Sequence, residues 1–402
     1  ILLLSDPDLM EQVLLRRQKE FEKPDTAVSD DVETIMGEGL LTTDGKKWRR
    51  QHRLLIPHFQ EPSVAEMVPF AVEETERLLD RWSSDSFNQP FSLFREMKRV
   101  GLRFISRALF SYQMSSEQTW EIRESIDTLR EIYRHRRTSL ITLPLWVPTP
   151  KNRRVKDARD RLYRFADKLI GDRRSSDAER EDMLGSMVKA CYEESEQQLT
   201  EDEMRAQIVT FIIAGYTTTA AAMGWMSYEL MKQPDLTKKV QEESSEAWAG
   251  NSVDDVLDSI PLTRAAFDET LRLYPTAPWI ARSNKEEITL GGFRLPAGTP
   301  IVMTPYLMHH NDDFYDRPDE FRPERFLGED SPGPLTYIPF SVGAHQCIGR
   351  EIALMEGPLI LSKIFSQGRF ERIMATPESA SIHTAVNLEP QEPVPVRFQF
   401  ES

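Results

Sequence analysis

The stretch that decides the fold is F-S-V-G-A-H-Q-C-I-G-R, residues 340–350. Its cysteine, Cys347, lies between Gly343 and Gly349 and directly precedes a predicted helix at about 348–366. Glycines let a backbone approach a bulky group and adopt conformations that a side chain forbids. Backbone N–H groups at a helix N-terminus stabilise a thiolate. A cysteine presented in this way can serve as a nucleophile or as a metal ligand.

The composition narrows the possible partners. The chain has 402 residues, with 50 Lys or Arg against 65 Asp or Glu, so its net charge is −15. This acidic balance argues against nucleic acid as the main partner, because phosphate binding needs a basic face. Two cysteines are too few for a disulfide scaffold or a Cys-based zinc or iron–sulfur site, and they fit the reducing cytoplasm. No run reaches the roughly 18 apolar residues of a membrane span.

Helical periodicity dominates the chain, and we predict one large, mainly α domain over 1–402 with small antiparallel β-sheets. Thr200 and Glu203 form a capping box that opens a helix running to about residue 231, and the apolar middle of this helix predicts burial. The other predicted helices are 5–23, 48–56, 64–82, 93–110, 116–137, 151–174, 177–194 and 261–274. We expect a loop at 24–44, a Pro-rich connector at 143–150, an irregular segment at 311–346, and strands within 285–305 and 380–400.

Together with Phe340 and Ala353, the cysteine completes the pattern F-x-x-G-x-x-x-C-x-G-x-x-x-A, which resembles the cytochrome P-450 superfamily of haem-thiolate enzymes. The resemblance implies the cytochrome P-450 fold, haem b as cofactor, and Cys347 as the thiolate ligand of its iron. It also implies haem contacts for Phe340 and Gly349. His345 stands where the family usually has Arg, and it can donate to a haem propionate. Since the resemblance starts at residue 1, we expect the family's segment before the first strand to be absent.

Two other segments resemble propionate-binding elements of that family. Trp48 begins a match to the family's W-x-x-x-R helix, with His52 in place of the usual Arg. Arg282 fits the family's strand Arg that also binds a propionate. Haem propionates need cationic or N–H donors, so Trp48, His52 and Arg282 are candidate contacts. The alternative for the first segment is a plain basic helix.

A structural network is expected behind the haem. Glu269 and Arg272 form the family's E-x-x-R, and Arg325 belongs to its P-E-R-F element. A Glu and an Arg three residues apart are in general only a solvated helix pair, worth tenths of a kcal/mol. The resemblance implies instead a buried cluster of these three residues, which is tolerable only if every member is paired. Its expected role is structural.

The apolar helix is interrupted by A-G-Y-T-T-T, residues 214–219. Threonines in a helix can simply bond back to their own backbone. The segment also resembles the family's A-G-x-(Asp/Glu)-T-T groove over the oxygen site. By this resemblance Ala214 and Gly215 leave room for dioxygen and Thr218 relays protons. Thr217 replaces the usual acid, and a threonine can relay a proton but cannot supply one near neutral pH.

By the same resemblance, apolar side chains form the substrate pocket. The candidates are Phe211, Trp279, Ile280 and Val394. Apolar walls favour a hydrophobic substrate of the terpenoid, fatty acid or polyketide type.

A basic cluster stands out on this acidic chain. It consists of Lys46, Lys47, Arg49, Arg50 and Arg53. The cluster is either a solvated face that also anchors haem or a docking patch for an acidic ferredoxin or flavodoxin, which with its reductase would supply electrons.

We therefore predict a haem-thiolate monooxygenase that inserts one oxygen atom from O2 into a hydrophobic molecule, using a separate redox partner. Thr217 motivates one alternative, a peroxide-driven or rearranging haem-thiolate enzyme. A haem-binding protein without turnover is a second alternative. A hydrolase with Cys347 as nucleophile lacks a base placed by any known motif.

Overall fold

The computed structural model describes residues 1–24, 27–84, 89–139, 143–176, 180–192, 198–328, 332–333, 335–373, 382–383, 387–390 and 393–401. The chain forms two compact units. Unit 1 comprises Ile1–Phe21, Glu61–Gly101 and Thr217–Ser402, and unit 2 comprises Glu22–Gln60 and Leu102–Tyr216. Two of the four boundaries fall inside helices α6 (Leu93–Phe110) and α10 (Glu201–Lys232).

The capping box predicted at the start of α10 is confirmed. The Glu203 N–H donates to Thr200 Oγ1 at 3.1 Å, and the Thr200 N–H donates to a Glu203 carboxylate oxygen at 2.9 Å. The helix ends at Lys232, and Pro234 opens the next helix. In the described part of the chain, α10 is the one helix long and apolar enough to cross a membrane, and most of its apolar stretch is buried in protein.

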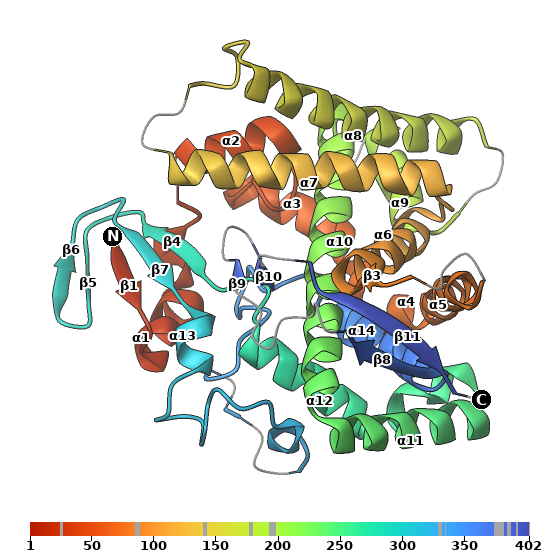
Figure 1. Ribbon diagram of the computed structural model, residues 1–402. Helices are drawn as coiled ribbons and strands as arrows, with labels where there is room; N and C mark the ends of the chain where they lie inside the picture. Colours follow the sequence, from red (N-terminus) through yellow and green to blue (C-terminus); the bar gives the residue numbers. More distant parts are fainter. Residues whose placement is uncertain are drawn as a thin grey trace. The chain divides into compact units, whose positions relative to one another are not determined.

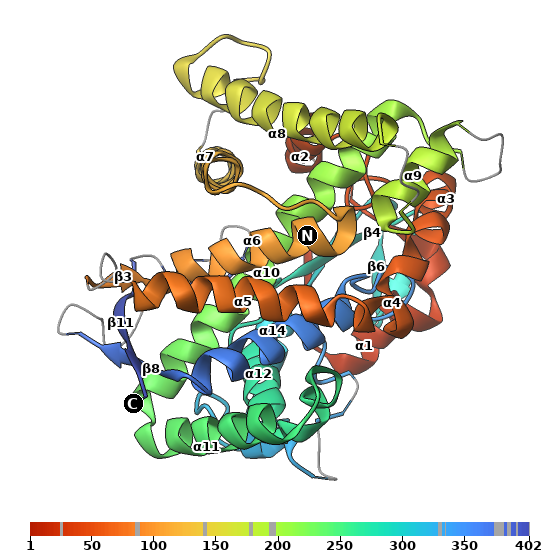
Figure 2. The same cartoon turned by 90° about the vertical axis from the view of Figure 1, so that its right-hand side faces the viewer.

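Helices of unit 1 pack around α14 (Arg350–Phe365), which follows the Cys347 loop. Figure 2 shows α14 beside α5, and it also packs against α11 and α12. The other helical segments of this unit are α1 (Pro7–Glu11), the π-helical turn Gln12–Arg16, the 3-10 turn Gln18–Glu20, α4 (Glu61–Ala65), α5 (Val68–Ser83), α11 (Pro234–Gly250), the 3-10 turns Val253–Asp255 and Leu257–Ser259, α12 (Pro261–Leu273), α13 (Pro305–His309) and the 3-10 turn Pro323–Phe326.

The candidate site residues Ile280 and Arg282, which come before α13 in the sequence, lie on a strand of unit 1. A four-stranded sheet has the order β1-β7-β4-β2 and is formed by β1 (Leu2–Leu4), β7 (Pro300–Met303), β4 (Ile280–Asn284) and β2 (Phe21–Glu22) (Figure 1). We expected only antiparallel pairing, but β1 runs parallel to β7 and the sheet is mixed. A hairpin joins β5 (Ile288–Leu290) to β6 (Phe293–Leu295), and Gly291 and Gly292 at its tip have φ of 57° and 81°. Positive φ at both positions is what the predicted Gly-Gly turn requires.

The remaining strands form two small antiparallel sheets. β3 (Phe91–Ser92), β11 (Pro395–Phe400) and β8 (Gly368–Arg372) make one, and β9 (Ile382–His383) and β10 (Glu389–Pro390) make the other. These strands confirm the β-structure expected in the last part of the chain.

Unit 2 is helical in its described residues. It contains α2 (Ala27–Met36), α3 (Gly45–Leu55), the 3-10 turn Ile56–Phe59, α7 (Ser116–Thr138), α8 (Pro150–Arg174) and α9 (Met183–Tyr192). Helices α7 and α8 lie side by side (Figure 1). The Pro-rich connector before α8 is non-helical, as predicted.

Several sequence-based boundaries were wrong. The predicted loop at 24–44 contains α2, because Ile35 and Met36 are buried and Arg136 of α7 pairs with Asp31 at 2.6 Å. The helix expected at 64–82 is divided into α4 and α5, with Pro69 in the first turn of α5. Helix α11 was not predicted at all. The helix expected at 177–194 is observed as α9, and residues 177–179 and 193–194 lie outside the described part.

Candidate functional site

The Cys347 loop of unit 1 is closed by its own backbone. The Cys347 N–H donates to the Phe340 carbonyl at 2.9 Å, and the Gln346 N–H donates to the Gly343 carbonyl at 3.0 Å. Gly343 has φ of 82°, and a Cβ added there would lie 2.1 Å from the Leu14 carbonyl oxygen. Both the left-handed backbone and the close approach of Leu14 therefore require glycine at this position.

The Cys347 sulfur is presented just before the N-terminus of α14. The residue is exposed to solvent on one side, while the protein packed around its other sides raises the pKa of the thiol by desolvation. A hydrogen bond from the Gly349 N–H opposes that rise. A metal ion binds the thiolate and displaces the proton. The described residues hold no cluster of three or more His, Cys, Asp or Glu that could bind a metal.

Candidate propionate and pocket residues of unit 1 lie on or beside β4. Ile280 and Arg282 are two residues apart on this strand and share a face of the sheet. Both are half-buried, as is Trp279, which immediately precedes the strand, and His345 in the Cys347 loop. Arg282 also donates to the Ala281 carbonyl at 2.7 Å.

Val394 lies in the last part of unit 1 and is fully buried. Its carbonyl accepts a hydrogen bond from the Leu93 N–H at 2.9 Å. This contact holds the segment before β11 against the start of α6.

The middle of α10 has one accessible side. Ala214 is exposed, and Gly215 and Thr218 are half-buried, although the helix is buried without a break from Thr219 to Leu230. Positions i, i+1 and i+4 lie on the same side of a helix. A Cβ on Gly215 would lie 2.8 Å from Ile105 Cγ1 of α6. Close packing against Ile105 thus also accounts for this glycine, which we expected to leave room for dioxygen.

Thr217 is buried, and its hydroxyl oxygen accepts a hydrogen bond from Asn387 Nδ2 at 2.8 Å. The segment that carries Asn387 is fastened to unit 1 at two further points. Trp225 Nε1 donates to the Leu388 carbonyl at 2.9 Å, and Lys98 pairs with Glu389 at 2.9 Å. Sequence reasoning missed Asn387, because no motif links it to a threonine 170 positions away.

Glu356 of α14 is a second functional candidate that the sequence did not reveal. The residue is buried, and among the described residues its Oε1 has no hydrogen-bond partner. Burial raises the pKa of this carboxyl well above its usual value, although a hydrogen bond with Thr219 of α10 opposes the rise. The Glu356 carboxyl therefore lies beside the threonine that follows Thr218.

In unit 2, Trp48 and His52 of α3 stack on each other with ring centroids 4.6 Å apart. Trp48 is buried and His52 is half-buried. Gln51 donates to the Glu38 carbonyl at 2.9 Å, which ties α3 to the preceding segment. Phe211 of α10 is buried against Phe59 at 5.2 Å between ring centroids, within the core of this unit.

The network of Glu269, Arg272 and Arg325 is assembled within unit 1. Arg272 Nε and Nη2 donate to the two Glu269 carboxylate oxygens at 2.7 and 2.8 Å, and both side chains are fully buried. Arg325 Nε donates to Glu269 Oε1 at 3.2 Å. The backbone N–H of Arg322 donates to the same oxygen at 2.9 Å. Among the described residues, the hydrogen bonds of the Glu269 carboxylate are thus all with donors, as a buried charge requires.

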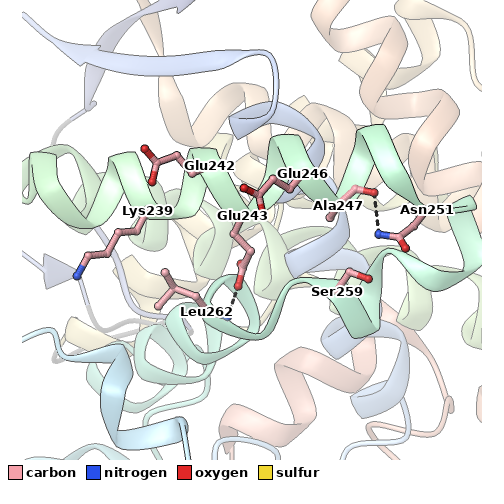
Figure 3. Close-up of a pocket in the computed structure, with 8 residues that line it drawn as sticks. All are labelled: Lys239, Glu242, Glu243, Glu246, Ala247, Asn251, Ser259 and Leu262. Carbon is pink, nitrogen blue, oxygen red and sulfur yellow. Dashed lines mark hydrogen bonds between the residues drawn. The ribbon is translucent and has the colours of Figure 1, made fainter.

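A surface pocket lies elsewhere on unit 1, between α11 and the start of α12 (Figure 3). Glu243 of α11 accepts hydrogen bonds from the Leu262 and Thr263 N–H groups at 2.7 and 2.9 Å. This glutamate caps α12, which begins at Pro261 without a capping side chain of its own. None of the candidate site residues lines this pocket.

Comparison with known proteins identifies relatives of this chain. A family model described as cytochrome P450 matches residues 1–395. A cyclooctat-9-en-7-ol 5-monooxygenase and a cyclooctatin synthase, both of Streptomyces melanosporofaciens, are each 31% identical to the chain. Their alignments cover 93% and 92% of the chain and 81% and 80% of the relatives. A bifunctional cytochrome P450/NADPH–P450 reductase of Bacillus subtilis is 29% identical over 90% of the chain and 35% of that protein.

Proposed function

Because the chain belongs to the cytochrome P-450 family, we propose that it inserts one oxygen atom from O2 into a hydrophobic organic molecule, with Cys347 as the iron ligand. The protein is a haem-b-dependent oxidoreductase of that family. The observation that supports the proposed role of Cys347 is its place on an exposed loop directly before α14, where the Gly349 N–H donates to its sulfur.

The residues present fit haem. Cys347 offers a single sulfur ligand, and a porphyrin supplies the further ligands that the described residues lack. Ala214 is exposed, although most of the middle of α10 is buried. When bound, haem supplies the activation of O2, which a thiolate ligand promotes.

The chain's own residues are proposed to bind the iron, to orient the haem and to donate hydrogen bonds to its propionates. Cys347 binds the iron, and Phe340 and Gly349 shape the backbone around it. We assign propionate contacts to Trp48, His52, Arg282 and His345, because indole, imidazole and guanidinium groups all offer N–H donors.

Proton delivery is proposed to pass through Thr218, whose half-buried hydroxyl lies on the accessible side of α10. Thr217 has a different role, since its oxygen accepts from Asn387 in a buried contact. Substituting Thr217→Asp tests this assignment, because the carboxyl group can still accept from the Asn387 amide and, when protonated, adds a proton donor. We expect more product per electron in T217D; unchanged coupling would refute a special role for position 217.

Thr217 also motivates an alternative, a reaction driven by hydrogen peroxide. The wild type would then turn over with peroxide as fast as with a redox partner.

For the substrate we propose a cyclic, terpenoid-type hydrocarbon skeleton, in keeping with the names of the two Streptomyces relatives. Half-buried Trp279 and Ile280 offer apolar surface for such a molecule, and we assign Phe211 and Val394 to the layer behind it. Titrating the holoprotein with a cyclic terpenoid alcohol, a fatty acid and a macrolactone tests the class. A high-spin spectral shift with the fatty acid alone would contradict the proposal.

Electrons are proposed to come from a separate ferredoxin or flavodoxin in the cytoplasm that docks on α3. Lys46, Arg49 and Arg53 are exposed and fall at i, i+3 and i+7 on one side of this helix. Lys47 and Arg50 instead pair with Glu38 and Glu203 within unit 2.

Charge reversal tests this docking face. K46E/R49E/R53E should slow electron transfer from an acidic ferredoxin and weaken the salt dependence of the rate. The control is K156E, which reverses an exposed charge on α8. Equal rates for the triple variant and the control would exclude α3 as the docking face.

A further inference from the structure

His309, the last residue of α13, is fully buried in unit 1. From sequence we expected both His309 and the adjacent His310 to be solvated or capping; His309 is not solvated, but its ring does contact the last turn of α12. Its Nδ1 lies 3.1 Å from the Arg272 carbonyl oxygen, and its Nε2 lies 3.0 Å from the Ile338 nitrogen.

These two contacts define one tautomer. The Ile338 N–H is a donor, so Nε2 of His309 must accept. The ring proton therefore resides on Nδ1 and is donated to the Arg272 carbonyl. Burial supports this neutral form, since it lowers the pKa of His309 to about 3. The imidazole thus joins two fixed backbone groups as a neutral bridge.

One end of the bridge is the buried charge network. Arg272 Nη1 donates to the His309 carbonyl at 2.7 Å, while its own carbonyl receives the imidazole N–H. The guanidinium of the same arginine is held by both oxygens of Glu269. His309 is therefore fixed to Arg272 through both its backbone and its ring.

The other end of the bridge is the start of the Cys347 loop. The Ile338 carbonyl accepts the Ser341 N–H at 3.0 Å, and Ser341 adopts φ of 59°. Between them, Phe340 presents the carbonyl that accepts the Cys347 N–H at 2.9 Å. A shift of the Ile338 peptide would thus pass directly to the backbone that holds Cys347.

We propose that His309 is a positioning residue, which holds the Cys347 loop against the Glu269–Arg272 network and so sets the position of the sulfur. This inference rests on the proposed role of Cys347 as the iron ligand. The neutral imidazole is suited to the task because it offers one donor and one acceptor on a rigid ring.

Three variants separate the two ends of the bridge. H309L removes both contacts. The H309N amide can reach only the Arg272 carbonyl, near the position of Nδ1. The longer H309Q side chain can place its amide oxygen near the position of Nε2, where it accepts from the Ile338 N–H. H310L is the matched control, since His310 is half-buried and, among the described residues, its ring hydrogen-bonds to the Tyr306 carbonyl one turn away at 2.8 Å and packs on the Tyr306 ring.

The readouts are the haem content, the reduction potential and the absorption spectrum of the reduced CO complex of each holoprotein. We expect the ratio of unshifted to red-shifted Soret species to rise roughly tenfold in H309L and H309N, the effect of one lost hydrogen bond on an equilibrium. H309Q and H310L should keep the wild-type ratio and potential.

The outcomes distinguish this proposal from the proposed role of Cys347 as the iron ligand, on which it rests. A wild type without a red-shifted band would refute Cys347 as the ligand. If the wild type has the red-shifted band, and H309N has an equal and stable band with an unchanged reduction potential, the proposed role of His309 is overturned. If H309L does not fold, the difference between H309N and H309Q decides, because a role in general stability alone predicts equal bands in the two folded variants.

Discussion

Replacing Glu269 by Gln tests the buried network most severely. The substitution keeps the shape of the side chain but removes the charge and turns one acceptor into a donor. Arg272, fully buried, loses its counter-charge, and Arg325 and the Arg322 N–H lose acceptor strength at Oε1. Breaking a buried ion pair by removing one partner costs about 3–5 kcal/mol. At about 2–4 °C per kcal/mol, the melting temperature should fall by about 6–20 °C.

The assay is thermal unfolding, with urea unfolding beside it, of the holoprotein and of the haem-free chain, both followed by tryptophan fluorescence. The control is E242Q, because the exposed pair of Glu242 and Lys238, 3.6 Å apart, contributes under about 1 kcal/mol. An E269Q variant as stable as E242Q, with wild-type haem content, would refute the view that this network supports the fold.

Three further predictions follow from the buried groups and from Gly215. For His309 the folded pKa is about 3 and the unfolded value is about 6.5, so its contribution to stability is complete above about pH 6.5 and is lost as the pH falls toward 3. Urea midpoints across pH should show this slope in the wild type and a flatter one in H309Q; parallel curves would contradict it. For Glu356 the pKa is raised, so stability is present below its unfolded value and lost as the pH rises. E356Q should be as stable as the wild type at acidic pH and more stable at neutral pH. If E356Q is less stable than the wild type at both pH values, the carboxylate of Glu356 is ionised in the folded protein. In G215A the new methyl group would lie 2.8 Å from Ile105, which should lower the free energy of unfolding by about 1–3 kcal/mol. In the double variant G215A/I105A the loss should be smaller than the sum of the losses in the two single variants.

Local signals explain what the sequence could predict. The capping box at Thr200 defined the start of α10, and the Gly291-Gly292 pair defined a hairpin tip. The spacing around Cys347 pointed to the family through a single contiguous segment, and the family model confirms that assignment. In each case a few neighbouring residues carry the whole physical requirement.

The missed features depend on contacts distant in sequence. Helix α2 has a short apolar stripe and is stabilised by packing and by the Asp31–Arg136 pair. His309 and His310 are neighbours of the same type, yet one is enclosed by Arg272 and Ile338 and the other bonds only to its own helix turn. No local pattern distinguishes such residues, because burial is decided by the whole fold.

The reduced, CO-bound absorption spectrum of the purified holoprotein, compared with that of C347H, tests the central claim most directly. We predict a strongly red-shifted Soret band in the wild type, which requires a thiolate opposite CO, and loss of that shift in C347H with haem retained. An unshifted band in the wild type, or a red-shifted band that survives in C347H, would contradict the assignment of Cys347 as the iron ligand.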